Sequence, residues 1–164
     1  MKYRAAVITV SDRSSKGQRE DSSGPLLKEL LEGADYLLTE SLIVPDEADL
    51  IAGALKRIAD SGSADAVFTT GGTGFSPRDV TPEATRRVIE REVPGIPEAM
   101  RQNSMMITKK AMLSRAVAGI RKKTLIINLP GSPKAVRENL LFILDTVKHG
   151  LEVLAGSVSD CGGS

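Results

Sequence analysis

A glycine-rich segment in the middle of the chain has the composition of a ligand-binding loop. It reads Thr70-Gly71-Gly72-Thr73-Gly74 and follows a short apolar run. Three glycines within four positions permit left-handed backbone angles and a close approach of a ligand. Their N–H groups could form an anion-binding concavity, and the Thr70 and Thr73 hydroxyls add donors. The alternative is a tight turn without a ligand. Binding is favoured because the loop follows a buried strand, where parallel sheets hold ligands.

The standard nucleotide-binding motifs do not explain this loop. No segment of the chain has the P-loop pattern that ends in Gly-Lys-Ser/Thr. Gly72-Thr73-Gly74 is followed by Phe75-Ser76-Pro77, so the dinucleotide fingerprint fails as well. A phosphate site here is therefore expected to be of another kind.

Two aspartates, Asp46 and Asp79, lie at turns next to predicted helix starts. Asp79 follows Pro77-Arg78 and precedes a predicted helix, where its carboxylate could bind Mg²⁺ that bridges phosphates. The alternative is that Asp79 is a charge at a helix start, where the helix dipole favours it. This alternative is weaker because Thr81 is already the predicted N-cap of that helix. Asp46 follows Pro45 and could either cap the next helix or belong to the site.

Two further turns carry polar groups at strand ends. Ser11 and Asp12 end the first strand-like run, where they could meet a ligand or form an Asx turn. Pro130-Gly131-Ser132-Pro133 is a second strand-to-helix turn, with Ser132 suited to the N-cap and Pro133 to the first helical position. Such a helix start also attracts phosphate.

The elements that position these loops alternate along the chain. Strands are predicted at 5–10, 37–44, 66–70 and 124–129, and helices at about 25–33, 46–59, 81–91, 98–106 and 109–118 and from 133 beyond 151. This order predicts a single-domain, three-layer α/β fold with a mostly parallel sheet covered by helices on both faces. We expect the domain to span residues 1–156 and residues 157–164 to form a flexible tail.

Composition excludes several other roles. With 22 Lys and Arg against 21 Asp and Glu and only 3% aromatic residues, nucleic-acid binding is not expected. One Cys (Cys161) and one His (His149) argue against a disulfide framework, a His/Cys zinc site and a His-based triad. No apolar run approaches the ~20 residues of a membrane span, and no signal peptide is evident, so the cytoplasm is the expected compartment.

Five blocks in order resemble the molybdopterin adenylyltransferase family, of the MogA/MoaB type that is also found as the G domain of gephyrin-like proteins. They cover nearly the whole chain. The blocks are Thr9-Val10-Ser11-Asp12-Arg13, Val44-Pro45-Asp46-Glu47, the loop from Thr69 to Thr85, Leu113-Ser114-Arg115-Ala116 and Asn128-Leu129-Pro130-Gly131-Ser132-Pro133.

The resemblance implies a reaction, in which ATP adenylylates molybdopterin in the presence of Mg²⁺ and pyrophosphate leaves. It implies that Asp46 and Asp79 are the essential carboxylates and hold Mg²⁺ directly or through phosphates and water. Gly71 to Gly74 would cradle the pterin or its phosphate, and Ser114, Arg115 and the turn Pro130-Gly131-Ser132 would line the rest of the site. A homotrimer and handover of the product to a molybdenum insertase are also implied.

Two other functions remain open at this point. One is a CinA-type enzyme acting on pyridine nucleotides, although Arg78-Asp79-Val80-Thr81-Pro82 fits the adenylyltransferases better. The other is a non-catalytic protein that binds molybdopterin or scaffolds its assembly, against which the presence of both Asp46 and Asp79 speaks.

Overall fold

The structure is a computed structural model, and it describes residues 1–157. Its elements in chain order are β1 (Arg4–Val10), α1 (Asp12–Ser15), α2 (Ser23–Gly33), β2 (Leu37–Val44), α3 (Ala48–Ser61), β3 (Ala66–Thr70), α4 (Thr81–Val88), β4 (Arg91–Glu92), α5 (Gly95–Met105), the 3₁₀ helix η1 (Lys109–Leu113), β5 (Ala118–Arg121), β6 (Thr124–Leu129) and α6 (Pro133–Leu154). Most of the expected tail, including Cys161, lies outside the described residues, so the boundary at residue 157 stays a prediction.

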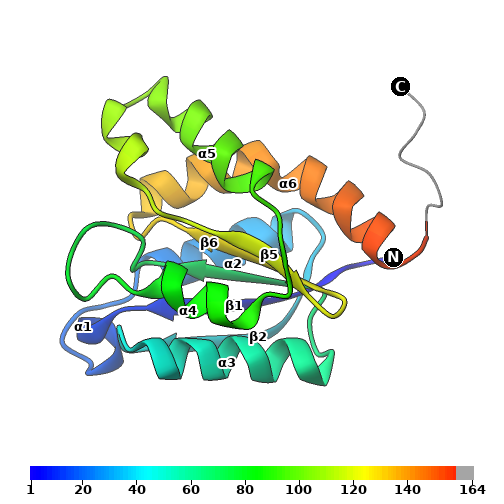
Figure 1. The fold of residues 1–164 in the computed structure, drawn as a ribbon, viewed down its shortest axis with the longest axis horizontal. Helices are drawn as coiled ribbons and strands as arrows, with labels where there is room; N and C mark the ends of the chain where they lie inside the picture. Colours follow the sequence, from blue (N-terminus) through cyan, green and yellow to red (C-terminus); the bar gives the residue numbers. More distant parts are fainter. Residues whose placement is uncertain (158–164) are drawn as a thin grey trace.

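One six-stranded sheet runs through the centre of the domain in the order β2-β1-β3-β6-β5-β4 (Figure 1). β2, β1, β3 and β6 pair in parallel, whereas β5 and β4 continue the sheet antiparallel. α2, α5 and α6 cover one face, and α3 and α4 cover the other (Figure 1). The predicted three-layer fold with a mostly parallel sheet is confirmed.

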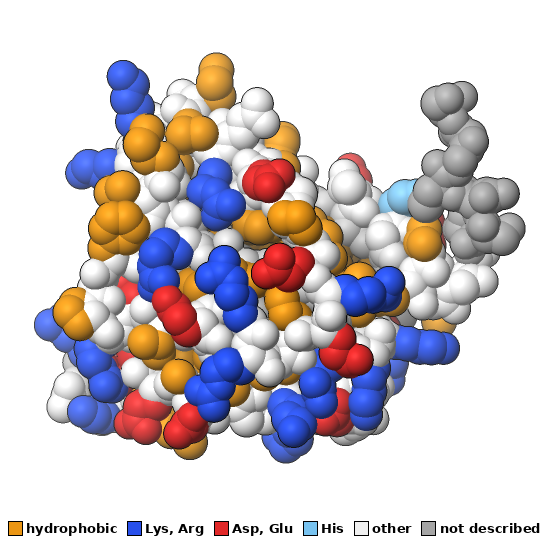
Figure 2. Space-filling model, viewed as in Figure 1, with side chains coloured by type: hydrophobic (Ala, Val, Ile, Leu, Met, Phe, Trp, Pro, Cys, Tyr) orange, Lys and Arg blue, Asp and Glu red, His pale blue; other side chains and the backbone are white. Residues whose placement is uncertain are grey.

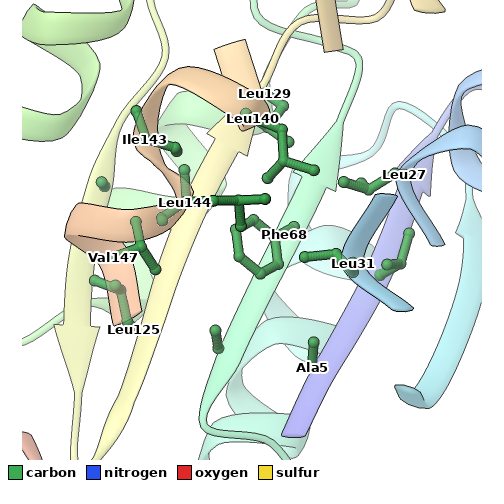
Figure 3. Close-up of a cluster of buried hydrophobic side chains, with 14 of the residues drawn as sticks. Ala5, Leu27, Leu31, Phe68, Leu125, Leu129, Leu140, Ile143, Leu144 and Val147 are labelled. Carbon is green, nitrogen blue, oxygen red and sulfur yellow. The ribbon is translucent and has the colours of Figure 1, made fainter. Parts of the chain in front are cut away.

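Alternating side chains of the strands fill a core on each face. Val7 and Phe68 point to the α2/α6 side, and their neighbours Ile8 and Val67 point to the α3/α4 side. Phe68 lies at the centre of the first cluster, between leucines of α2 and α6 (Figure 3). Strands buried on both faces are mostly apolar, and β1, β3 and β6 have this composition apart from Thr and Asn residues that are themselves buried.

The order of the strands places a ligand crevice between β1 and β3. From β1 the chain moves through α2 to β2 on one side, and then returns through α3 to β3 on the other side. The two connections lie on opposite faces, so a crevice opens beyond the carboxyl ends of β1 and β3. Thr9 pairs with Thr70, and Thr70 pairs with Leu129, so the loops after these strands begin at the same edge.

The structure corrects the predicted elements between residues 81 and 121. The helix predicted to reach Arg91 ends at Val88, because Arg91 and Glu92 form the edge strand β4. The helix predicted over 109–118 is a short 3₁₀ helix that ends at Leu113. β5 follows it and forms a hairpin with β6, in which Lys122 takes the left-handed conformation without a glycine to signal the turn.

Within residues 1–157, no helix is long and apolar enough to cross a membrane.

Candidate functional site

Four loops meet at the carboxyl edge of the parallel strands. They follow β1, β2, β3 and β6, and they contain Ser11-Asp12, Pro45-Asp46, Gly71 to Asp79 and Pro130 to Ser132. The loops after β3 and β6 are in direct contact, because a Cβ added at Gly131 would lie 3.3 Å from Cα of Gly71. The Thr70 hydroxyl donates to the Pro130 carbonyl at 2.7 Å and joins the same two loops.

The first two glycines of the glycine-rich loop, Gly71 and Gly72, are required for two reasons. Gly71 and Gly72 have φ of +98° and +69°, in the left-handed region. A Cβ at Gly71 would collide with the Val10 carbonyl, and one at Gly72 would collide with the Thr81 hydroxyl. The main chain is therefore bare at the point where the crevice opens, as an anion-binding loop requires.

Asp46 joins the loops after β1 and β2 and is not a helix cap. α3 begins at Ala48, with Glu47 at its cap position and no capping bond from a side chain. The Asp46 carboxylate instead accepts the Asp12 N–H at 2.8 Å, and the Asp12 carboxylate accepts the Asp46 N–H at 2.9 Å. This reciprocal pair locks the loops after β1 and β2 together. Partial burial raises the pKa of Asp46, and the negative charges of Asp12 and Asp79 raise it further.

Arg78 ties the glycine-rich loop to the same pair. Its Nε and Nη2 each lie 3.0 Å from a carboxylate oxygen of Asp12, in a two-pronged contact. Arg78 lowers the pKa of Asp12, so this carboxylate stays charged. Asp12 thus serves as a structural link between three loops, with its charge already matched by a guanidinium.

Asp79 lies against the glycine-rich loop at Gly74. Its Oδ2 accepts the Ser76 N–H at 3.0 Å, and a Cβ added at Gly74 would lie 2.9 Å from this oxygen. The corresponding point at Gly72 lies 3.3 Å from Oδ1 of Asp46. Two carboxylates therefore lie next to the loop, one at Gly72 and the other at Gly74.

The prediction that Thr81 caps α4 is wrong. Thr81 is the first residue of the helix, Val80 holds the cap position, and no side chain makes a capping bond. The fully buried Thr81 hydroxyl donates to the Gly71 carbonyl at 2.9 Å instead. It therefore anchors the glycine-rich loop, and Asp79 also has a structural contact of its own through Ser76.

The glycine-rich loop lies between two pockets, one on each side. One has a volume of about 290 Å³ and is lined by Thr73, Gly74, Ser114 and Pro130, together with apolar side chains of α5 and η1 such as Met100 and Leu113. The other has a volume of about 320 Å³, and its lining includes Ser11, Thr70, Gly71, Gly131 and Ser132. Most of the residues predicted to bind substrate therefore divide between two adjoining spaces.

The turn before α6 has the predicted cap. Ser132 occupies the N-cap, its hydroxyl accepts the Ala135 N–H at 3.2 Å, and Pro133 opens the helix. The start of α6 therefore faces the second pocket.

Arg115 adjoins the site in a way that the sequence did not predict. Its Nε donates to the Gly74 carbonyl at 2.8 Å, its Nη2 donates to the Asp79 carbonyl at 2.7 Å, and its Nη1 pairs with Glu83. These donors contact the protein itself, so the side chain underpins the loop.

Sequence reasoning also missed residues that shape the second pocket. Asp21 accepts the Thr9 hydroxyl at 2.7 Å and the Gly24 N–H at 3.0 Å, and this fixes the start of α2 against the end of β1. Both Thr9 and Asp21 line the pocket. The available signal was Asp21-Ser22-Ser23-Gly24-Pro25, which has the composition of a helix start.

The two flanking carboxylates suit Mg²⁺ that is shared with a substrate. Within residues 1–157 no cluster of three or more His, Cys, Asp or Glu side chains could hold a metal by itself. Mg²⁺ keeps several waters and is usually held by one or two carboxylates together with substrate phosphates. Asp46 and Asp79 offer such a pair, because one lies next to Gly72 and the other next to Gly74 of the same loop.

Residues 6–149 match the family model described as "Probable molybdopterin binding domain". The chain belongs to this family. It is 44% identical over 155 residues to the molybdopterin adenylyltransferase of Helicobacter pylori strain J99, and the match covers 92% of this chain and 87% of that protein. The Escherichia coli K12 molybdopterin adenylyltransferase is also 44% identical, over 90% of this chain and 79% of its own length.

Solved structures of this family have the same fold. The molybdopterin biosynthesis enzyme MoaB from Thermus thermophilus superposes with a TM-score of 0.89 at 44% identity, over 94% of this chain and 97% of that one. The resemblance inferred from the five sequence blocks is confirmed.

Proposed function

We propose that this protein is a molybdopterin adenylyltransferase of molybdenum cofactor biosynthesis, which uses ATP and Mg²⁺. The observation that carries the proposal is the pair of carboxylates, Asp46 and Asp79, that lie next to Gly72 and Gly74 of the loop between the two pockets. The 44% identity to enzymes with this name, over most of both chains, supports the same activity.

Two pockets suit a reaction between two phosphorylated substrates. Each pocket is near the lower end of the ~300–1,000 Å³ that ligand sites usually span. With molybdopterin in one and ATP in the other, their phosphates would meet over Gly71 to Gly74. The Gly71 N–H already donates to the Leu129 carbonyl, so the N–H groups of Gly72 to Gly74 and the start of α6 at Ser132 would bind phosphate oxygens there.

In the proposed reaction, a phosphate oxygen of molybdopterin attacks the α-phosphorus of ATP. A new P–O–P bond forms, the bond from the α-phosphorus to the bridging oxygen breaks, and pyrophosphate leaves with that electron pair. The attacking phosphate is already an anion, so no residue must act as a nucleophile or remove a proton. The task of the protein is to align the two phosphates and to balance their charge.

Asp46 and Asp79 are the residues that would hold Mg²⁺, which supplies positive charge to the crowded phosphates. The reciprocal contact with Asp12 fixes Asp46, and the Ser76 N–H fixes Asp79, before any ligand arrives. Such preorganised groups need no rearrangement during the reaction. Arg78 neutralises Asp12, which limits the surplus negative charge that the substrate phosphates would meet.

We also propose a cytoplasmic homotrimer that passes its product to a molybdenum insertase. An apolar patch supports a protein interface: Met105, Met106, Ile107, Met112 and Leu113 are exposed at the end of α5 and in η1. Figure 2 shows apolar side chains gathered at this corner of the molecule, at the upper left. Met100 is buried and belongs to the core, so it is not part of this surface. Light scattering should give three times the 17.5 kDa of one chain, and a monomer would refute the trimer.

Product analysis tests the enzymatic activity. Purified protein with molybdopterin, ATP and Mg²⁺ should release pyrophosphate and form adenylylated molybdopterin, and Asp79→Asn should form at least 100-fold less. Folded protein that binds molybdopterin without turnover would instead be a scaffold. Turnover of pyridine nucleotides alone would indicate the CinA-type activity.

A further inference from the structure

The segment that carries Asp79 projects from the domain with little packing of its own. Phe75 to Arg78 are all exposed, and Phe75 has 70% of its surface in contact with solvent. The loop cannot therefore be positioned by burial. Ser76 and Arg78 hold the segment from within, through Asp79 and Asp12, and the position of Asp79 depends also on fixation at the base of the loop, where Gly74 and Asp79 return to the domain.

Arg115 provides this fixation at both ends of the segment. Its guanidinium donates to the Gly74 carbonyl at 2.8 Å and to the Asp79 carbonyl at 2.7 Å, so one planar group joins the first and last residues. Its main-chain N–H also donates to the Thr73 carbonyl at 2.9 Å, which places the side chain directly beneath the loop. A guanidinium is suited to this task because its donors form a rigid, planar fork.

Glu83 holds the guanidinium in this orientation. Its carboxylate pairs with Nη1 of Arg115, the donor that the two carbonyls leave free. Burial opposes the charge of Glu83, but the contact with Arg115 prevails and lowers the pKa of this carboxyl. Glu83 lies in the first turn of α4, so the base of the loop is connected to a helix that packs against the sheet.

We propose that Arg115, oriented by Glu83, is a positioning residue that places the Asp79 carboxylate for adenylyl transfer. It acts through the main chain of residues 74–79 and makes no contact with substrate. This role rests on the proposed function, and it differs from the substrate-lining role that the family resemblance implied for Arg115.

The expected kinetic effect falls on turnover. A misplacement of about 1 Å in a reacting group can cost on the order of 100-fold in rate. Lysine keeps the positive charge of Arg115 but concentrates its donors at one atom, so it cannot reach both carbonyls and Glu83 in the same geometry. We therefore expect Arg115→Lys to lower kcat by about 10- to 100-fold, with KM for both substrates within about threefold of the parent. Glu83→Gln, which changes no shape, should lower kcat by a smaller factor in the same way.

The matched control is Arg121→Gln. Arg121 also donates to a main-chain carbonyl, that of Val88 at 3.0 Å, and pairs with a carboxylate, that of Asp60 at 2.8 Å. Its strand β5 runs antiparallel to β6, so Arg121 lies at the opposite edge of the sheet from the site. The control should keep the kcat of the parent even if it loses stability.

Two measurements together decide the matter. The first is hydrogen–deuterium exchange of the ligand-free proteins, in which residues 74–79 should exchange at least tenfold faster in Arg115→Lys and Glu83→Gln than in the parent and the Arg121→Gln control. The second is a double-mutant cycle with Asp79→Asn. If Arg115 acts through Asp79, Arg115→Lys should cost less than about threefold in kcat once Asp79 is replaced.

Three results would overturn the inference. The first is hydrogen exchange of residues 74–79 in Arg115→Lys that equals that of the parent. The second is a loss of kcat for Arg115→Lys that is as large in the Asp79→Asn background as in the parent. The third is a raised KM of Arg115→Lys at constant kcat, which would make Arg115 a substrate contact. The exchange measurement needs no substrate, so it tests the contact of Arg115 with the loop even if the parent makes no adenylylated product. In that case the proposed function fails and the positioning role for catalysis fails with it.

Discussion

Replacing Gly72 by alanine tests whether the glycine-rich loop is built around the two carboxylates. The added methyl group would collide with the buried Thr81 hydroxyl and would lie 3.3 Å from Oδ1 of Asp46. Alanine in the left-handed region costs about 1 kcal/mol of stability. Displacing the hydroxyl from the Gly71 carbonyl costs about 1 kcal/mol more, and the forced shift adds a similar amount.

Gly62→Ala is a matched control that measures the cost of placing alanine in the left-handed conformation alone. Gly62 has φ of +66°, against +69° for Gly72, but nothing lies within 4 Å of the position of its added Cβ. Gly62→Ala should therefore lose about 1 kcal/mol of unfolding free energy, and Gly72→Ala about 3 kcal/mol. The difference corresponds to a midpoint temperature about 4–8 °C lower for Gly72→Ala than for the control.

Activity should separate the two variants more sharply than stability. The contact at Asp46 requires a shift of a few tenths of an ångström, which should lower turnover of Gly72→Ala about tenfold at a temperature where it is fully folded. Denaturant unfolding and the adenylylation assay measure the two effects. Equal stabilities for the two variants, together with full activity in Gly72→Ala, would refute the close packing of this loop against Thr81 and Asp46.

Further outcomes follow from three individual side chains. Asp46→Asn should lower turnover by at least 100-fold, on the order of 3 kcal/mol of transition-state stabilisation. Its stability at pH 7 should be unchanged or higher, because burial raises the pKa of Asp46 and the charge of this carboxylate therefore opposes folding. Asp46→Ala should lose about 1 kcal/mol through the Asp12 N–H contact, whereas a loss confined to helix α3 would revive the capping role. Tyr36→Phe should raise stability by about 1 kcal/mol in thermal unfolding, because the Tyr36 hydroxyl is buried without a hydrogen-bond partner in the described structure; a loss of stability would show that it has one. NMR titration should place the pKa of Asp60 at about 2, below the ordinary 3.8, because Arg121 stabilises the carboxylate. The contribution of the Arg121–Asp60 pair to the free energy of unfolding is present above pH 4 and is lost as the pH falls towards 2. Arg121→Gln should return the pKa of Asp60 towards its ordinary value.

The sequence predicted the parallel strands well because three of the four, β1, β3 and β6, are almost entirely buried. The strand 66–70 is buried on both faces and begins with the apolar run Ala66-Val67-Phe68, so composition and length indicate a buried strand. The antiparallel edge escaped prediction because β4 has only two residues, both exposed, and β5 contains Gly119. Gly119 is required there because a Cβ would press on Ile89 and on the Arg91 carbonyl. This constraint exists only after the strands have paired.

The site was predictable in its location but not in its contacts. Because the carboxyl ends of parallel strands share one edge, the turns at Asp46 and Gly71 could be brought together from the order of the strands alone. The reciprocal contact of Asp46 with Asp12 depends on the register of β1 against β2, which no local pattern encodes. For the same reason, Thr81 was taken for a cap when its hydroxyl holds a residue ten positions earlier.

The central claim is that the adenylyl group moves by attack on the α-phosphorus of ATP at the Asp46–Asp79 pair. The most direct test is to follow label from ATP carrying ³²P at the α-position and, separately, at the γ-position. The α-label should appear in the molybdopterin product and the γ-label in pyrophosphate, and both should fall at least 100-fold in Asp79→Asn. Transfer of the γ-label to molybdopterin, or equal transfer of the α-label by Asp79→Asn, would contradict the mechanism.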